Sequence, residues 1–345
     1  MTGVPRVGLL LGDPCGIGPE LVARLVRHGE LDPGVATIVI GESRLLARGA
    51  EVAGIELRLP AISCPEEAEV HAGSAVLMAG PSLDPADAPV GEVSAPAGKY
   101  VLDAFRQALG LAQRRELGAI CFAPCNKQAM HEGGLAFEDE LRFFAHELGH
   151  HGYVGEINAT GELATTRVTS HVPLRAVADL ITEDAVLKAT RLAHDTLRAA
   201  GNPHPRIAVA GLNPHAGDGG IFGREEIDVI APAVGRARAE QIAAAGPYPA
   251  DTVFVRAKAG EFDAVVTMYH DQGQIAMKLM GFERGITILA GLPRAYRRAW
   301  PASRPGTSRT SPRAARRSSS PATASPPARA RCHLPGSATA LPPDP

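Results

Sequence analysis

Residues 211–226 read GLNPHAGDGGIFGREE, a glycine-rich turn that carries one histidine, His215. The residues before it, 206–212, are mostly apolar and have the length of a buried strand, and residues 225–245 have the composition of a helix. A histidine at the carboxyl end of a strand, beside backbone that can approach a ligand closely, is poorly placed for core packing. The stretch therefore predicts a strand–turn–helix unit with His215 at a functional site.

The same alternation of strand and helix extends in both directions from this unit. The expected strands are 7–11, 36–41, 118–124, 165–171, 206–212, 263–269 and 285–291, and the expected helices are 19 onward, 43–52, 94–116, 137–151, 182–200, 225–245 and 271–280. Repeated alternation of this kind predicts an α/β fold with mostly parallel sheets that helices cover on both faces.

Two further histidines occupy the same kind of position as His215. His171 ends the expected strand 165–171, and His270 follows the expected strand 263–269 with Asp271 next to it. Three imidazoles at three strand ends are the ligands that a divalent metal ion with open coordination positions needs. Ligation by neutral histidines alone leaves the ion's full charge available for Lewis-acid chemistry.

The composition excludes several classes of protein. The chain has 345 residues, a formal net charge of −2 and only 4% aromatic residues, which argues against nucleic-acid partners. No apolar run approaches the roughly 20 residues of a membrane span, and the amino terminus lacks the pattern of a signal peptide. Five cysteines without framework spacing indicate a reducing compartment, so we expect a cytoplasmic protein.

A competing motif occurs at residues 146–150, HELGH, which matches the H-E-x-x-H signature of zinc proteases. That interpretation would make Glu147 the general base. The longer metzincin pattern fails, because Tyr153 and Glu156 stand where a glycine and a third histidine are required. The apolar residues of this stretch favour an amphipathic packing helix instead: Phe143, Phe144 and Leu148.

Three further groups of polar residues have two interpretations each. Asn126 and Lys127 are either substrate or phosphate contacts or part of a solvated turn. Lys278 lies about two helical turns after His270, where it either reaches an anion near the metal or is a surface lysine. Asp251 either caps the following helix or assists proton transfer.

Taken together, the motifs resemble one enzyme family. GDPCGIGPE, PCNKQAM, VTSHVPL, GLNPHAGDGGIFGREE, GPYPADTVF and MYHDQGQIAMKLMGF are similar to the 4-hydroxythreonine-4-phosphate dehydrogenase (PdxA) family over roughly residues 5–293. The resemblance implies a homodimer whose subunit has two α/β/α domains, 1–135 and 136–293, as in isocitrate and isopropylmalate dehydrogenases. It implies an active site in the cleft near the dimer interface, and NAD binding without a GxGxxG loop, which this chain lacks.

The resemblance also implies roles for individual residues. The ligands of the divalent ion, which is Zn, Mg, Co or Mn, would be three histidines: His171, His215 and His270. Lys278 becomes a catalytic and substrate contact, and Asp251 and Asp271 become catalytic residues close to the metal. The implied reaction is oxidation of a secondary alcohol by hydride transfer to NAD, after which the resulting β-keto acid can lose CO₂.

Three departures from the family pattern alter the side of the site that holds the substrate's phosphate. Residues 139–142 read Asp-Glu-Leu-Arg where the family has Gly-His-Thr-Glu, so Glu140 and Leu141 replace an imidazole and a hydroxyl. Thr287 replaces an asparagine, and Tyr296 stands where an arginine is usual. The predicted substrate contacts are five residues: Lys127, Glu140, Leu141, Lys278 and Thr287.

These departures leave several substrates and one non-enzymatic role open. The family's usual substrate is 4-hydroxythreonine 4-phosphate, and erythronate or threonate 4-phosphate is the competing possibility. Because Glu140 would repel a phosphate at the usual place, a non-phosphorylated substrate is a further alternative. An inactive, ligand-binding relative is the alternative from another class.

The character of the sequence changes abruptly after Pro293. Residues 294–345 contain ten arginines, no lysine, one acidic residue and no isoleucine, valine or phenylalanine. A segment of this composition cannot bury enough apolar surface to order itself. We expect a low-complexity tail produced by a frameshift near codon 293, with a natural basic tail as the alternative; a frameshift would deprive the first domain of its last elements.

Overall fold

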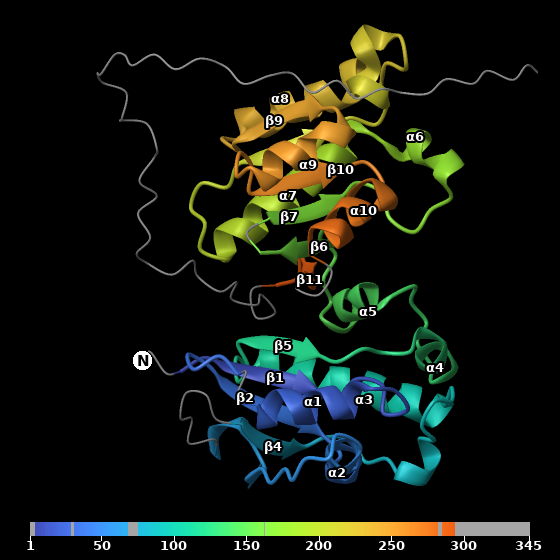
Figure 1. Ribbon diagram of the computed structural model, residues 1–345, viewed down its shortest axis with the longest axis vertical. Coiled ribbons are helices and arrows are strands. Elements are labelled where there is room, and N and C mark those ends of the chain that lie inside the picture. Colours follow the sequence, from blue (N-terminus) through green and yellow to red (C-terminus); the bar gives the residue numbers. More distant parts are fainter. Residues whose placement is uncertain (1–3, 29–30, 68–74, 162, 282–284, 294–345) are drawn as a thin grey trace, which may run out of the picture. The chain divides into compact units, whose positions relative to one another are not determined.

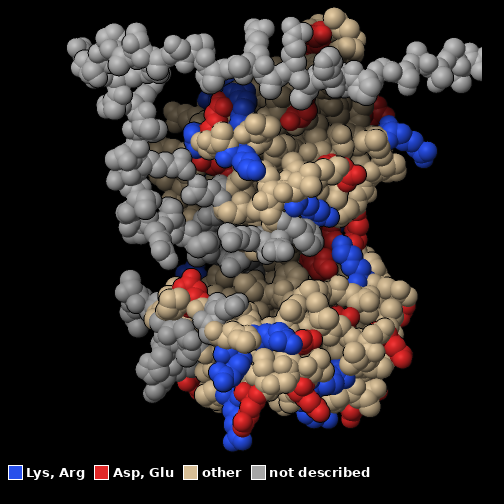
Figure 2. Space-filling model, in the orientation of Figure 1, with Lys and Arg blue, Asp and Glu red and all other residues tan. Residues whose placement is uncertain are grey.

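The computed structural model describes residues 4–28, 31–67, 75–161, 163–281 and 285–293. The predicted tail at 294–345, the predicted frameshift and Tyr296 therefore lie outside the described residues. Within the described residues no helix has the length and apolar character required to cross a bilayer. Basic and acidic side chains are interspersed on the face shown in Figure 2, in keeping with the small net charge.

The first sheet has five parallel strands in the order β3-β4-β2-β1-β5 (Figure 1). Its strands are β1 (Arg6–Leu10), β2 (Ala36–Gly41), β3 (Ala61–Ile62), β4 (Ala75–Ala79) and β5 (Ala119–Phe122). Its helices are α1 (Gly18–Arg27), α2 (Ser43–Val52), α3 (Ala95–Gln113) and α4 (Lys127–Glu132). Every residue of β2 is buried, as expected for a central strand that is covered on both faces.

The second sheet has six strands in the order β11-β6-β7-β10-β8-β9. Its strands are β6 (Gly155–Thr160), β7 (Leu163–Arg167), β8 (Ile207–Ala210), β9 (Ala244–Tyr248), β10 (Ala264–Thr267) and β11 (Gly285–Ala290). Strands β7, β10, β8 and β9 are parallel, whereas β6 pairs antiparallel with both β7 and β11. The carboxyl ends of β7, β10 and β8 are therefore neighbours at one edge of the sheet.

The alternation of side chains along β8 explains how helices cover both faces of this sheet. Ile207 and Val209 belong to one apolar core, and Ala208 and Ala210 belong to another on the opposite face. The helices of this part are α6 (Val177–Leu180), α7 (Glu183–Ala199), α8 (Ala231–Ala239), α9 (Ala250–Lys258) and α10 (His270–Gly281). Residues of α7 and α8 fill the first core, and those of α9 and α10 fill the second. The observed architecture confirms the predicted α/β fold with mostly parallel sheets.

Several predicted elements differ in extent from the observed ones. The helix predicted at 225–245 is a π-helical turn, η5 (Glu226–Ile230), followed by α8, and β9 begins at Ala244. The helix predicted at 137–151 is the shorter α5 (Glu140–Glu147), because Leu148 caps it and Gly149 has a positive φ of 60°. Strand β6 was not predicted; its hairpin partner β7 and the edge strand β11 supply the hydrogen bonds that define it.

An ion pair at the opposite edge of the second sheet gives a test of this architecture. Arg206 donates from its backbone N–H to Asp263 Oδ2 at 2.8 Å, and its guanidinium Nη2 lies 2.8 Å from Oδ1, which joins the starts of β8 and β10. Burial raises the pKa of the Asp263 carboxyl, but the hydrogen bonds from Arg206 outweigh this, so the pKa is lowered. A lowered folded-state pKa stabilises the protein above the unfolded pKa of about 4, and this contribution is lost as the pH falls through the folded value.

We therefore expect Asp263→Asn to lower the free energy of unfolding at pH 7 by about 1 kcal/mol, a discounted value because the Arg206 side chain is half exposed. The difference from the wild type should narrow as the pH falls below about 4. Urea denaturation at several pH values measures both effects. Asp184→Asn is the control, because the exposed Asp184–Lys188 pair should contribute little; equal effects of the two substitutions would contradict the assignment.

Candidate active site

Two of the predicted metal ligands lie side by side at the carboxyl edge of the second sheet. His171 lies in the loop after β7, and His270 is the first residue of α10, which begins three residues after the end of β10. Because β7 and β10 are adjacent parallel strands, their ends bring the two imidazoles to a centroid separation of 5.7 Å. The side chains are 45% and 38% exposed, so a ligand can reach both from solvent.

Acidic groups flank these two histidines. The Nδ1 atom of His270 lies 2.7 Å from Asp271 Oδ1, and His171 Nδ1 lies 3.9 Å from Glu138 Oε1. When Nδ1 of His270 carries the hydrogen, it donates to Asp271, and Nε2 keeps the lone pair that a metal ion needs. Asp271 therefore fits the part of an orienting carboxylate for His270.

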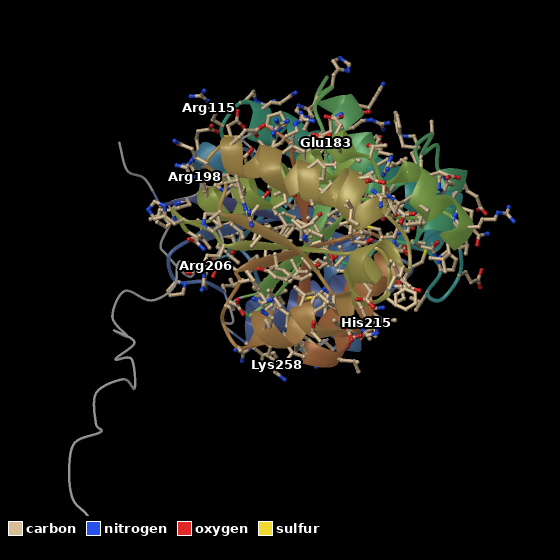
Figure 3. All side chains as sticks on the ribbon, turned by 90° about the horizontal axis from the view of Figure 1, so that it is seen from above. Arg115, Glu183, Arg198, Arg206, His215 and Lys258 are labelled. Atoms are coloured by element: carbon tan, nitrogen blue, oxygen red, sulfur yellow. The ribbon has the colours of Figure 1, made fainter. Side chains whose placement is uncertain are left out.

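His215 lies in a turn with an unusual backbone. The turn, η4 (Pro214–Gly220), contains six consecutive residues with positive φ, from His215 to Gly220, with values between 43° at Asp218 and 100° at Gly220. The imidazole is exposed, and its centroid lies 6.3 Å from the Phe222 ring. Figure 3 shows His215 on the side of the molecule opposite Arg206, which places the two residues at opposite ends of β8. The turn thus carries His215 at the carboxyl end of β8.

The donor set fits a divalent ion in part within one chain. His171 and His270 are close enough to share an ion, and the acceptor on Asp271 favours the ligating form of His270. Among the described residues, however, no three histidine, cysteine, aspartate or glutamate side chains of one chain are grouped so that they could hold a metal. Of the three histidines predicted as ligands, only His171 and His270 are therefore close together within the described part of one chain.

Two predicted substrate contacts line one hollow. Lys278 and Thr287 border a cavity of about 150 Å³ together with Asn158 and Gln274. Asn158 donates to Thr287 Oγ1 at 2.9 Å and lies 2.5 Å from the Gln274 amide nitrogen. The hollow is lined by one cation and several amide and hydroxyl groups, a chemistry that suits an oxyanion.

Glu140 borders a different and larger cavity. That cavity has a volume of about 430 Å³, and its lining includes Glu156 and Thr287 as well as the apolar side chains of Phe144 and Leu292. Lys127 Nζ lies 3.8 Å from Glu140 Oε2 and is half exposed. With two carboxylates in its lining, this cavity is less suited to a phosphate than the hollow beside Lys278.

Two other predicted roles have to be corrected. Leu141 is 2% exposed and packs in the core of the first sheet, so its side chain is not available to a substrate in this conformation. Asp251 is exposed in the first turn of α9, and Pro249 occupies the N-cap position, so Asp251 does not cap the helix. Asn126 does cap a helix, since its Oδ1 accepts from Ala129 N at 3.0 Å in α4. The capping bond gives Asn126 a structural role that neither interpretation named.

The H-E-x-x-H motif does not form the geometry of a zinc protease. Helix α5 ends at Glu147, so His146 and His150 do not share one face of a helix. His146 is 65% exposed, and its ring stacks at 4.8 Å on Phe137. Phe143 and Phe144 are buried against Phe105, which confirms that α5 packs through its apolar face.

Sequence reasoning missed three polar residues that hold the loops of this edge. Arg167 is buried at the end of β7, where it forms an ion pair with Glu156 and donates from Nε to Ser170 Oγ at 2.9 Å, one residue before His171. Glu226 and Gln272 bond the backbone of the glycine-rich turn. A charged residue within the predicted strand 165–171 was the available signal for Arg167. No signal in the sequence separated Glu226 from its neighbour Glu225.

Comparison with known proteins gives one consistent family. The model of the family described as "Pyridoxal phosphate biosynthetic protein PdxA" matches residues 34–297. The chain is 47% identical to a protein of Pseudomonas aeruginosa, provisionally named as a second 4-hydroxythreonine-4-phosphate dehydrogenase, over 84% of this chain and 87% of that protein. It is 38% identical to the D-threonate 4-phosphate dehydrogenase of Cupriavidus necator, over 84% of this chain and 87% of that one.

A solved structure agrees with this result. The 4-hydroxythreonine-4-phosphate dehydrogenase of Klebsiella pneumoniae superposes with a TM-score of 0.76 at 37% identity, over 84% of this chain and 87% of that chain. At this identity the likeness extends beyond the fold to the family.

Proposed function

Because the chain belongs to the PdxA family, we propose that it is an NAD- and divalent-metal-dependent dehydrogenase that oxidises a CH–OH group of a small phosphorylated hydroxy acid. The observation that carries the proposal is the pair of imidazoles, His171 and His270, which lie 5.7 Å apart at the ends of adjacent parallel strands. The substrates named for the relatives, 4-hydroxythreonine 4-phosphate and D-threonate 4-phosphate, are the two candidates.

The residues of the site divide into an ion-binding part and a substrate-binding part. His171, His270 and His215 would hold the ion, which when bound supplies a Lewis acid for the substrate hydroxyl, while NAD accepts the hydride. Asp271 orients His270 through the hydrogen bond at Nδ1. Lys278, with Asn158 and Thr287 beside it, would bind the phosphate or carboxylate of the substrate in the hollow that these residues line.

We assign the third ligand, His215, to a second copy of the chain. Ile221 and Phe222, which follow the His215 turn, are 76% and 50% exposed, and Leu174, three residues after His171, is 71% exposed. Large apolar side chains that are exposed near a site are typical of a surface that another chain covers. A homodimer would bury them and complete the ligand set, of which the described part of one chain groups only two histidines. In this proposal residues 1–135 and 136–293 are the two domains of a cytoplasmic subunit.

The proposal predicts which substrates are turned over. We expect NADH formation from D-threonate 4-phosphate or 4-hydroxythreonine 4-phosphate in the presence of a divalent ion. The dephosphorylated parents should react about 10–100-fold more slowly, because they lack the anion that the Lys278 ammonium would pair with. Absorbance at the NADH band measures the rate, and a chelator should abolish it. Binding without turnover would instead support an inactive relative, and equal rates with the parents would support a non-phosphorylated substrate.

A further inference from the structure

Glu226 is a buried carboxylate directly beneath the turn that carries His215. Its residue is 2% exposed, and in the described part of the chain it forms no ion pair with a lysine or arginine. Burial of an ionised carboxylate is unfavourable unless hydrogen bonds replace the lost water. Three such bonds are present: the N–H groups of Leu212 and Asn213 each donate to Oε1 at 2.7 Å, and Asn213 Nδ2 donates to Oε2 at 3.0 Å.

The turn that Glu226 contacts requires outside support. His215, Ala216 and Asp218 have φ values of 54°, 54° and 43°, a left-handed conformation that is unfavourable for residues with a side chain. Such strain persists only where the surroundings fix it, and it is commonest at functional sites. The carboxylate also packs against the turn itself, since a Cβ atom on Gly217 would lie 2.7 Å from Glu226 Oε2.

A second side chain links this turn to the helix that begins with His270. Gln272 donates from Nε2 to the carbonyl oxygen of Gly211 at 2.8 Å, and its Oε1 accepts from Met268 N at 2.7 Å. The backbone of residues 211–213 is thus held on the N–H side by Glu226 and on the carbonyl side by Gln272. Both attachments precede the left-handed run, so they fix the point from which His215 projects.

We propose that Glu226 is a positioning residue that locks the glycine-rich turn in the conformation that presents His215 as a metal ligand. The inference rests on the proposed function in one respect only, namely that His215 is a metal ligand. Glu226 does not touch the ion or the substrate; it acts through the backbone of Leu212 and Asn213, as the outer partners of metal ligands do in other sites.

The test compares Glu226→Ala and Glu226→Gln with Asp228→Asn. Asp228 lies two residues later in the same helical turn, and its 52% exposed side chain pairs with Arg224 at the surface. Asp228→Asn is therefore a matched control that also removes one carboxylate but leaves the glycine-rich turn untouched. In Glu226→Gln the Oε1 atom still accepts the two backbone hydrogen bonds. The new NH₂ group, however, faces the NH₂ group of Asn213, and two donors cannot form a hydrogen bond. The effect of Glu226→Gln should therefore be intermediate. Two properties are measured: hydrogen exchange of the Leu212 and Asn213 amides in the metal-free protein, and Co²⁺ affinity by absorption titration.

We expect exchange of the two amides to be about 10-fold faster or more in Glu226→Ala, and Co²⁺ affinity to be 10–100-fold lower, the usual range for outer partners. Glu226→Gln should lie between Glu226→Ala and the wild type, and Asp228→Asn should match the wild type. If Glu226→Ala does not fold, as judged by circular dichroism, Glu226→Gln decides the question. Unchanged exchange of the Leu212 and Asn213 amides in the folded variants would overturn the inference. Faster exchange of these amides together with unchanged Co²⁺ affinity would also overturn it, provided that His215→Ala loses Co²⁺.

The failure of the proposed function has a separate signature. If His215→Ala retains Co²⁺ with wild-type affinity, His215 is not a metal ligand, and that part of the proposed function is wrong. Exchange at Leu212 and Asn213 still judges whether Glu226 locks the turn, because that measurement uses the metal-free protein.

Discussion

Replacement of any one of three histidines by alanine should remove the divalent ion and abolish NADH formation. The variants are His171→Ala, His215→Ala and His270→Ala. Each substitution removes a ligand outright, so the loss of ion affinity should exceed the roughly 100-fold that the loss of an outer partner causes. Atomic emission of the purified variants measures the bound metal, and absorbance of NADH measures the rate with each phosphorylated substrate.

His146→Ala is the control, because His146 has an exposed ring in contact with Phe137 and is not one of the three predicted ligands, so its loss should leave metal content unchanged. Loss of metal in His146→Ala together with retention in His215→Ala would show the assignment to be wrong. A mixture of His171→Ala and His215→Ala subunits adds a test of the dimer. If His215 belongs to a second copy, mixed dimers contain one intact site and regain activity that neither variant has alone.

The positions of the histidines at strand ends could be predicted because they depend on local sequence alone. An apolar run followed by a glycine-rich turn places His215 after β8, and an apolar run followed by the start of α10 places His270 after β10. The parallel order of β7, β10 and β8 makes their carboxyl ends neighbours. The distance between the imidazoles could not be predicted in this way. It depends on the direction in which each loop leaves its strand, and His215 leaves through a left-handed turn that only tertiary contacts support.

Strands β6 and β9 were not predicted, for a related reason. Strand β9 begins Ala-Ala-Gly-Pro, and its alanines continued the helical pattern of α8, so pairing with β8 and not local propensity decides its structure. Strand β6 contains glycine and asparagine, which are poor strand formers, and exists through its antiparallel neighbours. The role of Glu226 could not be predicted for the same reason. Its neighbour Glu225 has the same side chain, and only the burial of Glu226 and its bonds to the backbone of Leu212 and Asn213 distinguish the two.

The second large effect concerns stability, and it follows from Phe105 in α3. Its side chain is 1% exposed, and its ring packs edge-on at 5.0 Å from Phe122 of β5 and 4.8 Å from Phe144 of α5. We expect Phe105→Ala to lower the free energy of unfolding by about 3–5 kcal/mol, because a large cavity replaces the ring and the edge-to-face contacts are lost. Urea denaturation monitored by circular dichroism measures the change.

Val255→Ala on α9 is the control for a surface position, since Val255 is 69% exposed and its truncation should change stability by less than about 0.5 kcal/mol. A loss of under about 1 kcal/mol in Phe105→Ala would contradict the packing described here. The same cluster decides how α5 should be interpreted. Phe143 and Phe144 pack α5 against the core through their contacts with Phe105. The H-E-x-x-H motif begins on the last turn of this helix and extends beyond it. The motif therefore belongs to a packing helix and does not form a zinc site.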